Sequence, residues 1–122
     1  MEVNRETMEY DVVVVGAGPS GLATAIKIKK LSPDTNVCIL EKGSEVGAHI
    51  LSGNVFETRA LDELIPDWRK KDSPIKTKVS KEKFLFLGKN SSLSWPTWLL
   101  PSVQKNHKNY IISLANLCRW LA

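Results

Sequence analysis

The stretch YDVVVVGAGPSGLATAIKIKK, residues 10–30, decides the fold. Four consecutive valines at 12–15 form a β-branched run, which is typical of a strand buried on both faces of a parallel sheet. A glycine-rich turn follows, and Leu22, Ala25 and Ile26 then recur at the spacing of one helix face. The stretch therefore predicts a strand, a tight turn and a helix in direct succession.

A second strand of the same kind is expected at residues 36–40. The sequence Ser-Pro-Asp stops the helix, and an apolar run follows that ends at Glu41. Strand, helix and strand in this order form one βαβ unit, whose crossover is right-handed. Further along the chain we expect a loop at 43–54, a short helix at 59–65, a strand within 76–87, a turn at 88–90, and a helix from Asn109 onward.

The glycines of the turn have the spacing of a dinucleotide-binding fingerprint, and they lie between a strand and a helix as that motif requires. Gly16 permits the tight turn, Gly18 lets the backbone approach a pyrophosphate, and Gly21 lets the helix pack close to the strand. The helix N-terminus offers unpaired N–H groups to phosphates. Glu41 can accept hydrogen bonds from ribose hydroxyls. The cofactor-binding residues predicted here are Gly16, Gly18, Pro19, Ser20, Gly21, Glu41 and Lys42.

The fingerprint by itself does not separate FAD from NAD. Its position near the N-terminus favours FAD, and so does a second glycine-bearing loop, GAHILSG at 47–53. Such a loop, returning from the second strand, can reach the flavin end of an extended cofactor. It adds His49, Leu51, Ser52 and Gly53 to the predicted FAD site, although His49 can equally be a polar loop residue without a role. Because a flavin performs the redox chemistry itself, no catalytic side chain is assigned.

A second unusual stretch, LSWPTWLLPS at 93–102, carries two tryptophans, three leucines and two prolines. The prolines exclude a central strand or a helix interior, so this stretch is a loop or an edge segment. Its apolar side chains need a cover, which can be more protein, a ligand or a membrane. Residues 69–89, directly before it, hold eight bases and two acids and so carry a local charge of +6.

The composition, 43% hydrophobic and 25% charged over 122 residues, is that of one small globular domain. No apolar run is long enough to span a bilayer, and the first residues resemble neither a signal peptide nor a mitochondrial presequence. Cys38 and Cys118 lie in apolar patterns and are expected in the core. No nucleic-acid recognition motif accompanies the basic stretch. Because a parallel sheet needs more than two strands, we expect the N-terminal part of a longer protein.

Five strings together resemble one family, electron transfer flavoprotein–ubiquinone oxidoreductase. The glycine fingerprint is generic, whereas the GAHILSG loop and the NYIISLANLCRWL segment are much more particular. Lys108 and Ala115 stand where the family pattern leads us to expect glycine. The strings are GAGPSGLATAIKIKKL, LEKGSEVGAHILSGNVFE, LDELIPDW, FLFL and NHKNYIISLANLCRWLA.

The resemblance implies an FAD enzyme, peripheral to a membrane, that takes electrons from reduced electron transfer flavoprotein and passes them to ubiquinone. It implies a [4Fe–4S] cluster on cysteines beyond residue 122, so no metal ligand is assigned in this chain. The segment before the last helix would belong to a quinone-binding part that inserts into the bilayer surface, which suits interfacial tryptophans and nearby lysines. The alternative is a core contact with further protein. The residues concerned are Trp95, Pro96, Trp98, Leu99 and Leu100.

The expected fold class is α/β: a Rossmann-like FAD-binding βαβ unit, then the start of a quinone- or membrane-facing β-containing segment, in an incomplete domain. The expected location is the cytoplasmic face of a bacterial inner membrane. Two rivals stay open: another FAD-dependent reductase on this scaffold, such as a prenyl-lipid reductase, and a catalytically incompetent FAD-binding fragment. The expected parts are a tail (1–8), the FAD-binding unit and flavin loop (9–66), the basic and Trp-rich segment (67–106) and a returning helix (107–122).

Overall fold

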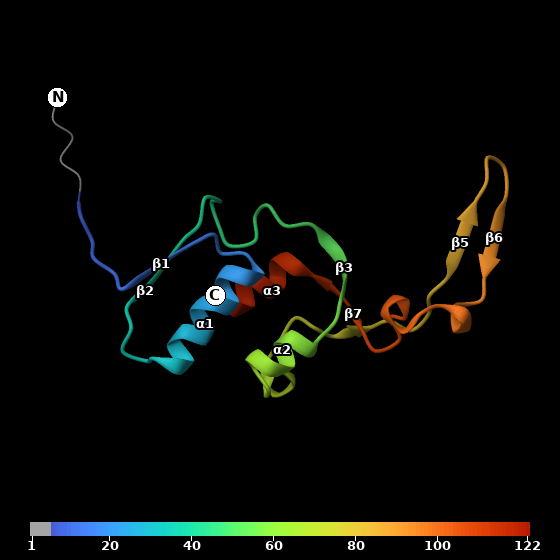
Figure 1. The fold of residues 1–122 in the computed structure, drawn as a ribbon. Helices are drawn as coiled ribbons and strands as arrows, with labels where there is room; N and C mark the ends of the chain where they lie inside the picture. Colours follow the sequence, from blue (N-terminus) through green and yellow to red (C-terminus); the bar gives the residue numbers. More distant parts are fainter. Residues whose placement is uncertain (1–5) are drawn as a thin grey trace, which may run out of the picture. The chain divides into compact units, whose positions relative to one another are not determined.

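The computed structural model describes residues 6–122, so most of the tail predicted at 1–8 lies outside the described residues. The fold mixes helices and strands (Figure 1). The described chain forms two compact units. Unit 1 combines the chain up to Ile50 with Ala115–Ala122, and unit 2 comprises Leu51–Leu114.

Unit 1 contains the strand, helix and strand that the sequence predicts. They are β1 (Val12–Val15), α1 (Pro19–Leu31) and β2 (Val37–Leu40). The two strands pair in parallel, with Val12 opposite Val37. At the start of the pair, the Asn36 backbone N–H donates to the Asp11 carboxylate (2.7 Å), which holds the two strands in this register.

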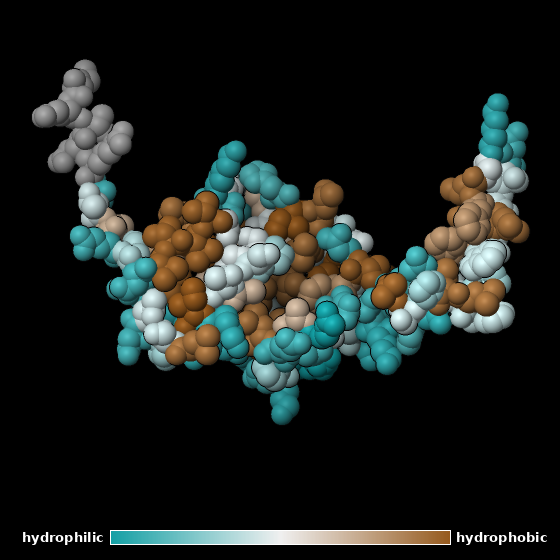
Figure 2. All heavy atoms as spheres, viewed as in Figure 1, coloured by the Kyte–Doolittle hydropathy of each residue, from teal (hydrophilic) through white to brown (hydrophobic). Residues whose placement is uncertain are grey.

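One face of the β1–β2 pair is open in the described chain. Val13, Val15 and Leu40 are 50%, 84% and 53% exposed, and Figure 2 shows hydrophobic side chains gathered over this region. The prediction that these strands are buried on both faces is therefore wrong for this structure. Helix packing covers only the face that carries Ile39, which contacts the buried cluster beneath α1.

The core of unit 1 depends on α3 (Leu114–Leu121), which lies beside α1 in Figure 1. Ala17, Leu22 and Cys118 form a buried cluster, with Cys118 fully excluded from solvent, as its apolar pattern predicts. The helix predicted from Asn109 begins only at Leu114, so the prediction of a helix across 107–122 is wrong at its start. Residues 110–113 form a strand instead, because two other strands offer them backbone partners.

Unit 2 is built on a three-stranded antiparallel sheet. Its central strand, β7 (Tyr110–Ser113), pairs with β3 (Ser52–Phe56) on one side and β4 (Thr77–Lys78) on the other. Residues 52–54 were expected in a loop, and their pairing with β7 makes them a strand. The expected short helix is present as α2 (Arg59–Leu64), and it is followed by a 3₁₀ helix, η1 (Trp68–Lys70).

The second half of unit 2 is an antiparallel hairpin of β5 (Phe84–Leu87) and β6 (Ser92–Trp95), followed by two 3₁₀ turns, η2 (Thr97–Leu99) and η3 (Ser102–Gln104). The turn predicted at 88–90 is present, and the strand predicted within 76–87 is split into β4 and β5. The Glu82 carboxylate accepts from the Asn106 backbone N–H (3.0 Å), which closes the base of the segment that carries the hairpin.

Candidate functional site

The glycine turn between β1 and α1 provides an open approach to the backbone. Gly16 has φ +98°, a conformation that favours glycine, and its N–H donates to Leu40 O (2.7 Å). A Cβ placed on Gly18 would meet no atom within 4 Å, whereas one on Gly21 would lie 2.0 Å from Gly16 O. Gly21 is therefore needed for packing, and Gly18 leaves space in front of the turn.

The N-terminus of α1 follows this turn directly. Gly18 is its N-cap and makes no side-chain capping bond, Pro19 occupies the first turn, and no acidic side chain is present there. Ser20 lies in the same turn and is exposed. The first N–H groups of a helix lack intrahelical partners and carry a partial positive charge. This arrangement fits an anionic group such as a phosphate placed in the space before Gly18.

Glu41 lies at the end of β2 and is held against the turn. Its Oε2 accepts from the Ala17 backbone N–H and its Oε1 from that of Gly43, each at 2.7 Å. These two bonds, the one from Gly43 first, lower the pKa of the Glu41 carboxyl below its ordinary value, and the nearby His49 contributes in the same direction. The carboxylate is therefore ionised and fixed beside the glycine turn, where ribose hydroxyls could donate to it.

The loop after β2 is anchored to α3. Gly47 has φ +84°, and a Cβ on it would lie 2.8 Å from Ala115 O, so the loop backbone approaches the helix closely. The Arg119 guanidinium donates to the Glu45 carboxylate (2.8 Å) across the same contact. Ala115, although not the expected glycine, has a side chain small enough to permit this approach.

The predicted cofactor residues are divided between the two units. The turn at 16–21, Glu41, Lys42 and His49 all belong to unit 1, and both Lys42 and His49 are exposed. Leu51, Ser52 and Gly53 belong to unit 2. Leu51 is 82% exposed, and Ser52 and Gly53 open strand β3, where Gly53 has φ +78°.

The Trp-rich stretch is a surface feature of unit 2 in the described chain. Trp95 lies in β6, Pro96 precedes η2, and Leu100 is half-buried. Trp98 and Leu99 lie in η2 and are 74% and 50% exposed. Figure 2 shows hydrophobic side chains along the neighbouring hairpin, where Phe84, Phe86 and Trp95 make edge-to-face contacts.

Sequence patterns gave no indication of a network around Asp62 in unit 2. Its carboxylate accepts from the Trp68 indole N–H (2.7 Å), the Arg69 guanidinium (2.6 Å) and the Thr58 hydroxyl (2.9 Å). These bonds, that of Trp68 first, lower the pKa of the Asp62 carboxyl. The only sequence signal was a tryptophan beside the basic stretch, which does not reveal its acceptor.

Comparison with known proteins assigns the chain to a family. The model of the Thi4 family matches residues 1–64. The mitochondrial electron transfer flavoprotein-ubiquinone oxidoreductase of Oryza sativa subsp. japonica is 60% identical and covers 97% of this chain. The probable electron transfer flavoprotein-ubiquinone oxidoreductase of Acinetobacter baylyi is 50% identical over 98% of the chain. The mitochondrial protein of that name from Bos taurus is 40% identical over 99%.

Because the Thi4 model matches just over half of the chain, the chain is a member of the Thi4 family. Over nearly its whole length, it belongs to the electron transfer flavoprotein–ubiquinone oxidoreductase family, as the sequence motifs predicted. The chain spans about a fifth of the length of these relatives: 20%, 22% and 20% for the rice, Acinetobacter and bovine proteins.

Two further properties apply to residues 6–122. None of the helices there combines the length and the apolar character needed to cross a membrane. No three His, Cys, Asp or Glu side chains of that part gather into a group that could hold a metal ion.

Proposed function

We propose that this chain is the FAD-binding N-terminal part of an oxidoreductase that passes electrons from reduced electron transfer flavoprotein to ubiquinone. The observation that carries the proposal is the open space at Gly18, at the N-terminus of an uncapped helix and beside a fixed, ionised Glu41. These are the features that a Rossmann-like βαβ unit uses to bind a dinucleotide. The names of the relatives supply the reaction.

The residues of unit 1 would hold the adenosine half of FAD. The backbone of 16–21 would bind the pyrophosphate, and Glu41 would accept from the ribose hydroxyls, with Lys42 beside it. Bound FAD would supply the electron-accepting and electron-donating chemistry. His49, Leu51, Ser52 and Gly53 would contact the flavin half, chiefly through backbone amides. The proposal assigns 9–66 to FAD, 67–106 to quinone or membrane and 107–122 to the return to the FAD domain, although the compact units divide at 50/51 and 114/115.

The hairpin and the Trp-rich stretch would contact the membrane surface and the quinone. Phe86, Leu87, Leu93 and Trp98 are 53%, 77%, 65% and 74% exposed, an apolar load that water does not favour. Tryptophan prefers the interface between hydrocarbon and headgroups. Lys81, Lys83, Lys89 and Lys105 are nearby in sequence and would favour anionic headgroups. The protein would thus be peripheral, at the cytoplasmic face of a bacterial membrane, and a [4Fe–4S] cluster would be held by residues beyond this chain.

The experiment is to purify the full-length protein and measure its flavin content, its reduction by electron transfer flavoprotein, and the transfer of electrons to a soluble ubiquinone analogue. We expect stoichiometric FAD and quinone reduction that depends on electron transfer flavoprotein. A colourless protein that cannot be reconstituted with FAD contradicts the proposal. Reduction by NADPH without an iron–sulfur signal would instead identify the rival class of FAD-dependent reductase.

Membrane contact is tested separately by sedimentation with liposomes that contain or lack anionic lipid, at low and high salt. The double variant Trp95→Ser/Trp98→Ser should bind less at either salt concentration, because both exposed rings are lost. Thr97→Ser, between them, is the matched control. If liposome binding changes neither with anionic lipid nor with the double substitution, the result favours the alternative that Trp95 and Trp98 pack in a core against further protein.

A further inference from the structure

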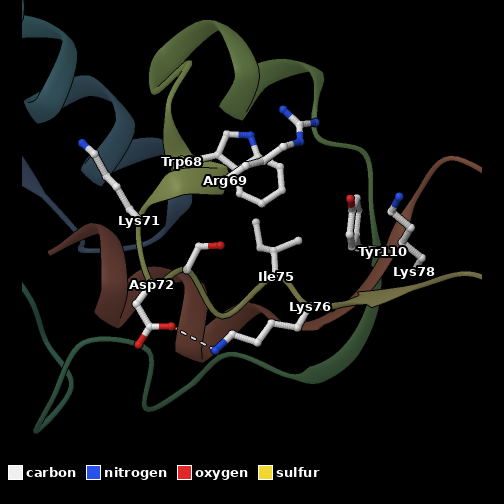
Figure 3. A pocket seen from close by; sticks show the side chains of 9 residues that line it. Trp68, Arg69, Lys71, Asp72, Ile75, Lys76, Lys78 and Tyr110 are labelled. Atoms are coloured by element: carbon white, nitrogen blue, oxygen red, sulfur yellow. Dashed lines mark hydrogen bonds and ion pairs between the residues drawn. The ribbon is translucent and has the colours of Figure 1, made fainter.

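Unit 2 contains a pocket of about 540 Å³ that is lined by none of the named cofactor residues and by none of residues 95–100 (Figure 3). Its floor is apolar: Trp68 and Ile75 are 2% and 5% exposed, and Tyr110 meets Trp68 edge-to-face at 6.0 Å. The size is in the range that binds a small molecule or a few side chains of another protein. We call this feature the basic pocket because of the side chains around it.

Cations dominate the rim of the basic pocket. Four of the lining side chains are basic (Arg69, Lys71, Lys76 and Lys78), and Asp72 is the one acidic lining residue. The lining side chains therefore sum to +3, and to +1 when Asp62 and Asp67, the partners of Arg69 and Lys71, are included. The rim cations belong to the stretch 69–89, whose net charge is +6, so the positive field extends well beyond the pocket itself.

Three of these four cations have a carboxylate partner, and for Lys71 and Lys76 solvent screens the pair on both sides. Lys71 pairs with Asp67 at 3.5 Å and Lys76 with Asp72 at 2.9 Å, and all four side chains are more than half exposed. Exposed i,i+4 pairs of this kind are weak. An incoming carboxylate can therefore exchange with Asp67 or Asp72 at little cost.

Arg69 is held in place before any ligand arrives. Its guanidinium lies 4.3 Å from the centre of the Trp68 ring, and Nη1 donates to the Asp62 carboxylate (2.6 Å). A guanidinium has five N–H donors in a fixed planar arrangement, and one of them, on Nη1, donates to Asp62. The other N–H groups can donate to a bound oxyanion. Because the folded protein already holds the Arg69 side chain in one conformation, binding a ligand costs it little further conformational entropy.

Lys78 and Tyr110 lie beside Arg69. The Lys78 ammonium is 6.0 Å from the centre of the Tyr110 ring. Figure 3 shows the polar ends of Arg69, Tyr110 and Lys78 on the same side of the pocket. Within residues 6–122, no carboxylate forms an ion pair with Lys78 at 4.0 Å or less. Two cations and a hydroxyl thus converge next to an apolar floor.

We propose that the basic pocket binds an acidic segment of a partner protein, with its carboxylates on Arg69, Lys78 and the Tyr110 hydroxyl and an apolar side chain above Ile75. Aromatic and arginine side chains at the centre with exchangeable charges at the rim are the usual composition of an interface anchor. The inference is independent of the proposed flavin site, which uses other residues.

The geometry favours an acidic protein segment over two other anions. A nucleobase needs an accessible aromatic face for stacking, and the Trp68 ring is buried under Arg69. A small free anion would neutralise one or two charges, whereas four cations line the pocket. Several carboxylates in one segment match this distribution and would also accelerate association at low salt.

The experiment measures the anisotropy of a fluorescein-labelled peptide, Glu-Glu-Glu-Leu-Glu-Glu-Glu, with the full-length protein at low and high salt. The same peptide with glutamine in place of glutamate tests charge, and an all-glutamate peptide tests the apolar floor. Lys78→Gln removes a rim cation of the pocket. Lys70→Gln is the matched control, because Lys70 is basic, lies in the same 3₁₀ helix as Arg69 and does not line the pocket. Asp72→Asn removes the acidic residue of the rim.

We expect Lys78→Gln to weaken peptide binding about two- to fivefold, the range of one exposed ion pair. Lys70→Gln should change binding by less than about 1.5-fold, and Asp72→Asn should strengthen it, since one repulsive carboxylate is lost. Added salt should weaken binding to every variant. The proposal is overturned if Lys70→Gln weakens binding as much as Lys78→Gln, if the glutamine peptide binds equally well, or if inorganic phosphate displaces the peptide at concentrations near the peptide Kd. Equal thermal unfolding of the three variants checks that folding is unchanged.

Discussion

Substitutions of Gly18 and Gly21 separate binding from folding within one turn. The backbone at Gly18 (φ −76°, ψ 177°) is ordinary extended conformation, and a Cβ there meets nothing within 4 Å. Gly18→Ala and Gly18→Val should therefore change the free energy of unfolding of the cofactor-free protein by no more than about 1 kcal/mol, because unfolded-state entropy and N-cap preference act in opposite directions. At Gly21 a Cβ would lie 2.0 Å from a backbone oxygen, so Gly21→Ala should cost about 3 kcal/mol or more.

Substitution of Gly18 should affect cofactor binding much more than it affects folding. If the pyrophosphate lies against the turn, the valine side chain occupies its place, and an overlap that costs about 1–3 kcal/mol weakens FAD binding roughly five- to 150-fold. Gly18→Val should thus be folded but poor in flavin. Gly16→Ala gives an intermediate case, since φ +98° costs a side chain about 1–2 kcal/mol without any contact.

The assay uses the full-length protein, with flavin content from visible absorbance and stability from denaturant unfolding of the cofactor-free form. Both measurements are needed for Gly18→Val, because a folding defect alone would lower the flavin content and the stability of the cofactor-free form together. Wild-type flavin content in Gly18→Val would refute the placement of the pyrophosphate. Strong destabilisation of its cofactor-free form would refute the reading of Gly18 as open space.

Two further predictions concern carboxylates. Asp62→Ala leaves the buried Trp68 indole N–H without its acceptor and should cost about 1–3 kcal/mol in urea unfolding, whereas Asp62→Asn keeps an acceptor oxygen and should cost clearly less; equal losses would contradict this account. The pKa of Glu41 is lowered in the folded state, so its stabilising contribution is present above the ordinary glutamate value of about 4.3 and is lost as the pH falls through the folded-state value. Glu41→Gln should reduce the loss of stability below about pH 4. If the stability–pH profile of Glu41→Gln equals that of the wild type, the assigned role of the Glu41 carboxylate is wrong.

Local sequence patterns predicted the elements whose partners lie close in the chain. The valine run, the glycine turn and the helix follow one another, and β2 pairs with β1 after a single crossover, so periodicity and turn chemistry were sufficient. The position of Glu41 followed from the same unit, and its two backbone donors lie within that unit. Spacing does not reveal these donors, because they depend on the path of the turn in three dimensions.

Elements that depend on distant partners were missed. The segment 110–113 fits a helical apolar pattern, yet it alternates in burial, with Ile112 at 4% and Ile111 at 46% exposure, because strands β3 and β4 flank it. The first residues of β3, 52–54, were predicted as a loop for the same reason, since their partner strand β7 is far along the chain. The basic pocket was also not predicted, because it joins the stretch after α2 to β7. Its charge was visible in the sequence, and its apolar floor was not.

Residues 115–122 belong to the same unit as residues 6–50, and this arrangement determines when that unit can fold during synthesis. Cys118 contacts Ala17 and Leu22, so the first hundred residues leave the ribosome before that cluster can close. The nascent glycine turn would remain without its final support while the whole of 51–114 is being translated. If unit 1 binds FAD as proposed, binding during translation should start only after α3 has emerged, and a ribosome stalled before residue 114 should present a segment with little affinity for the cofactor.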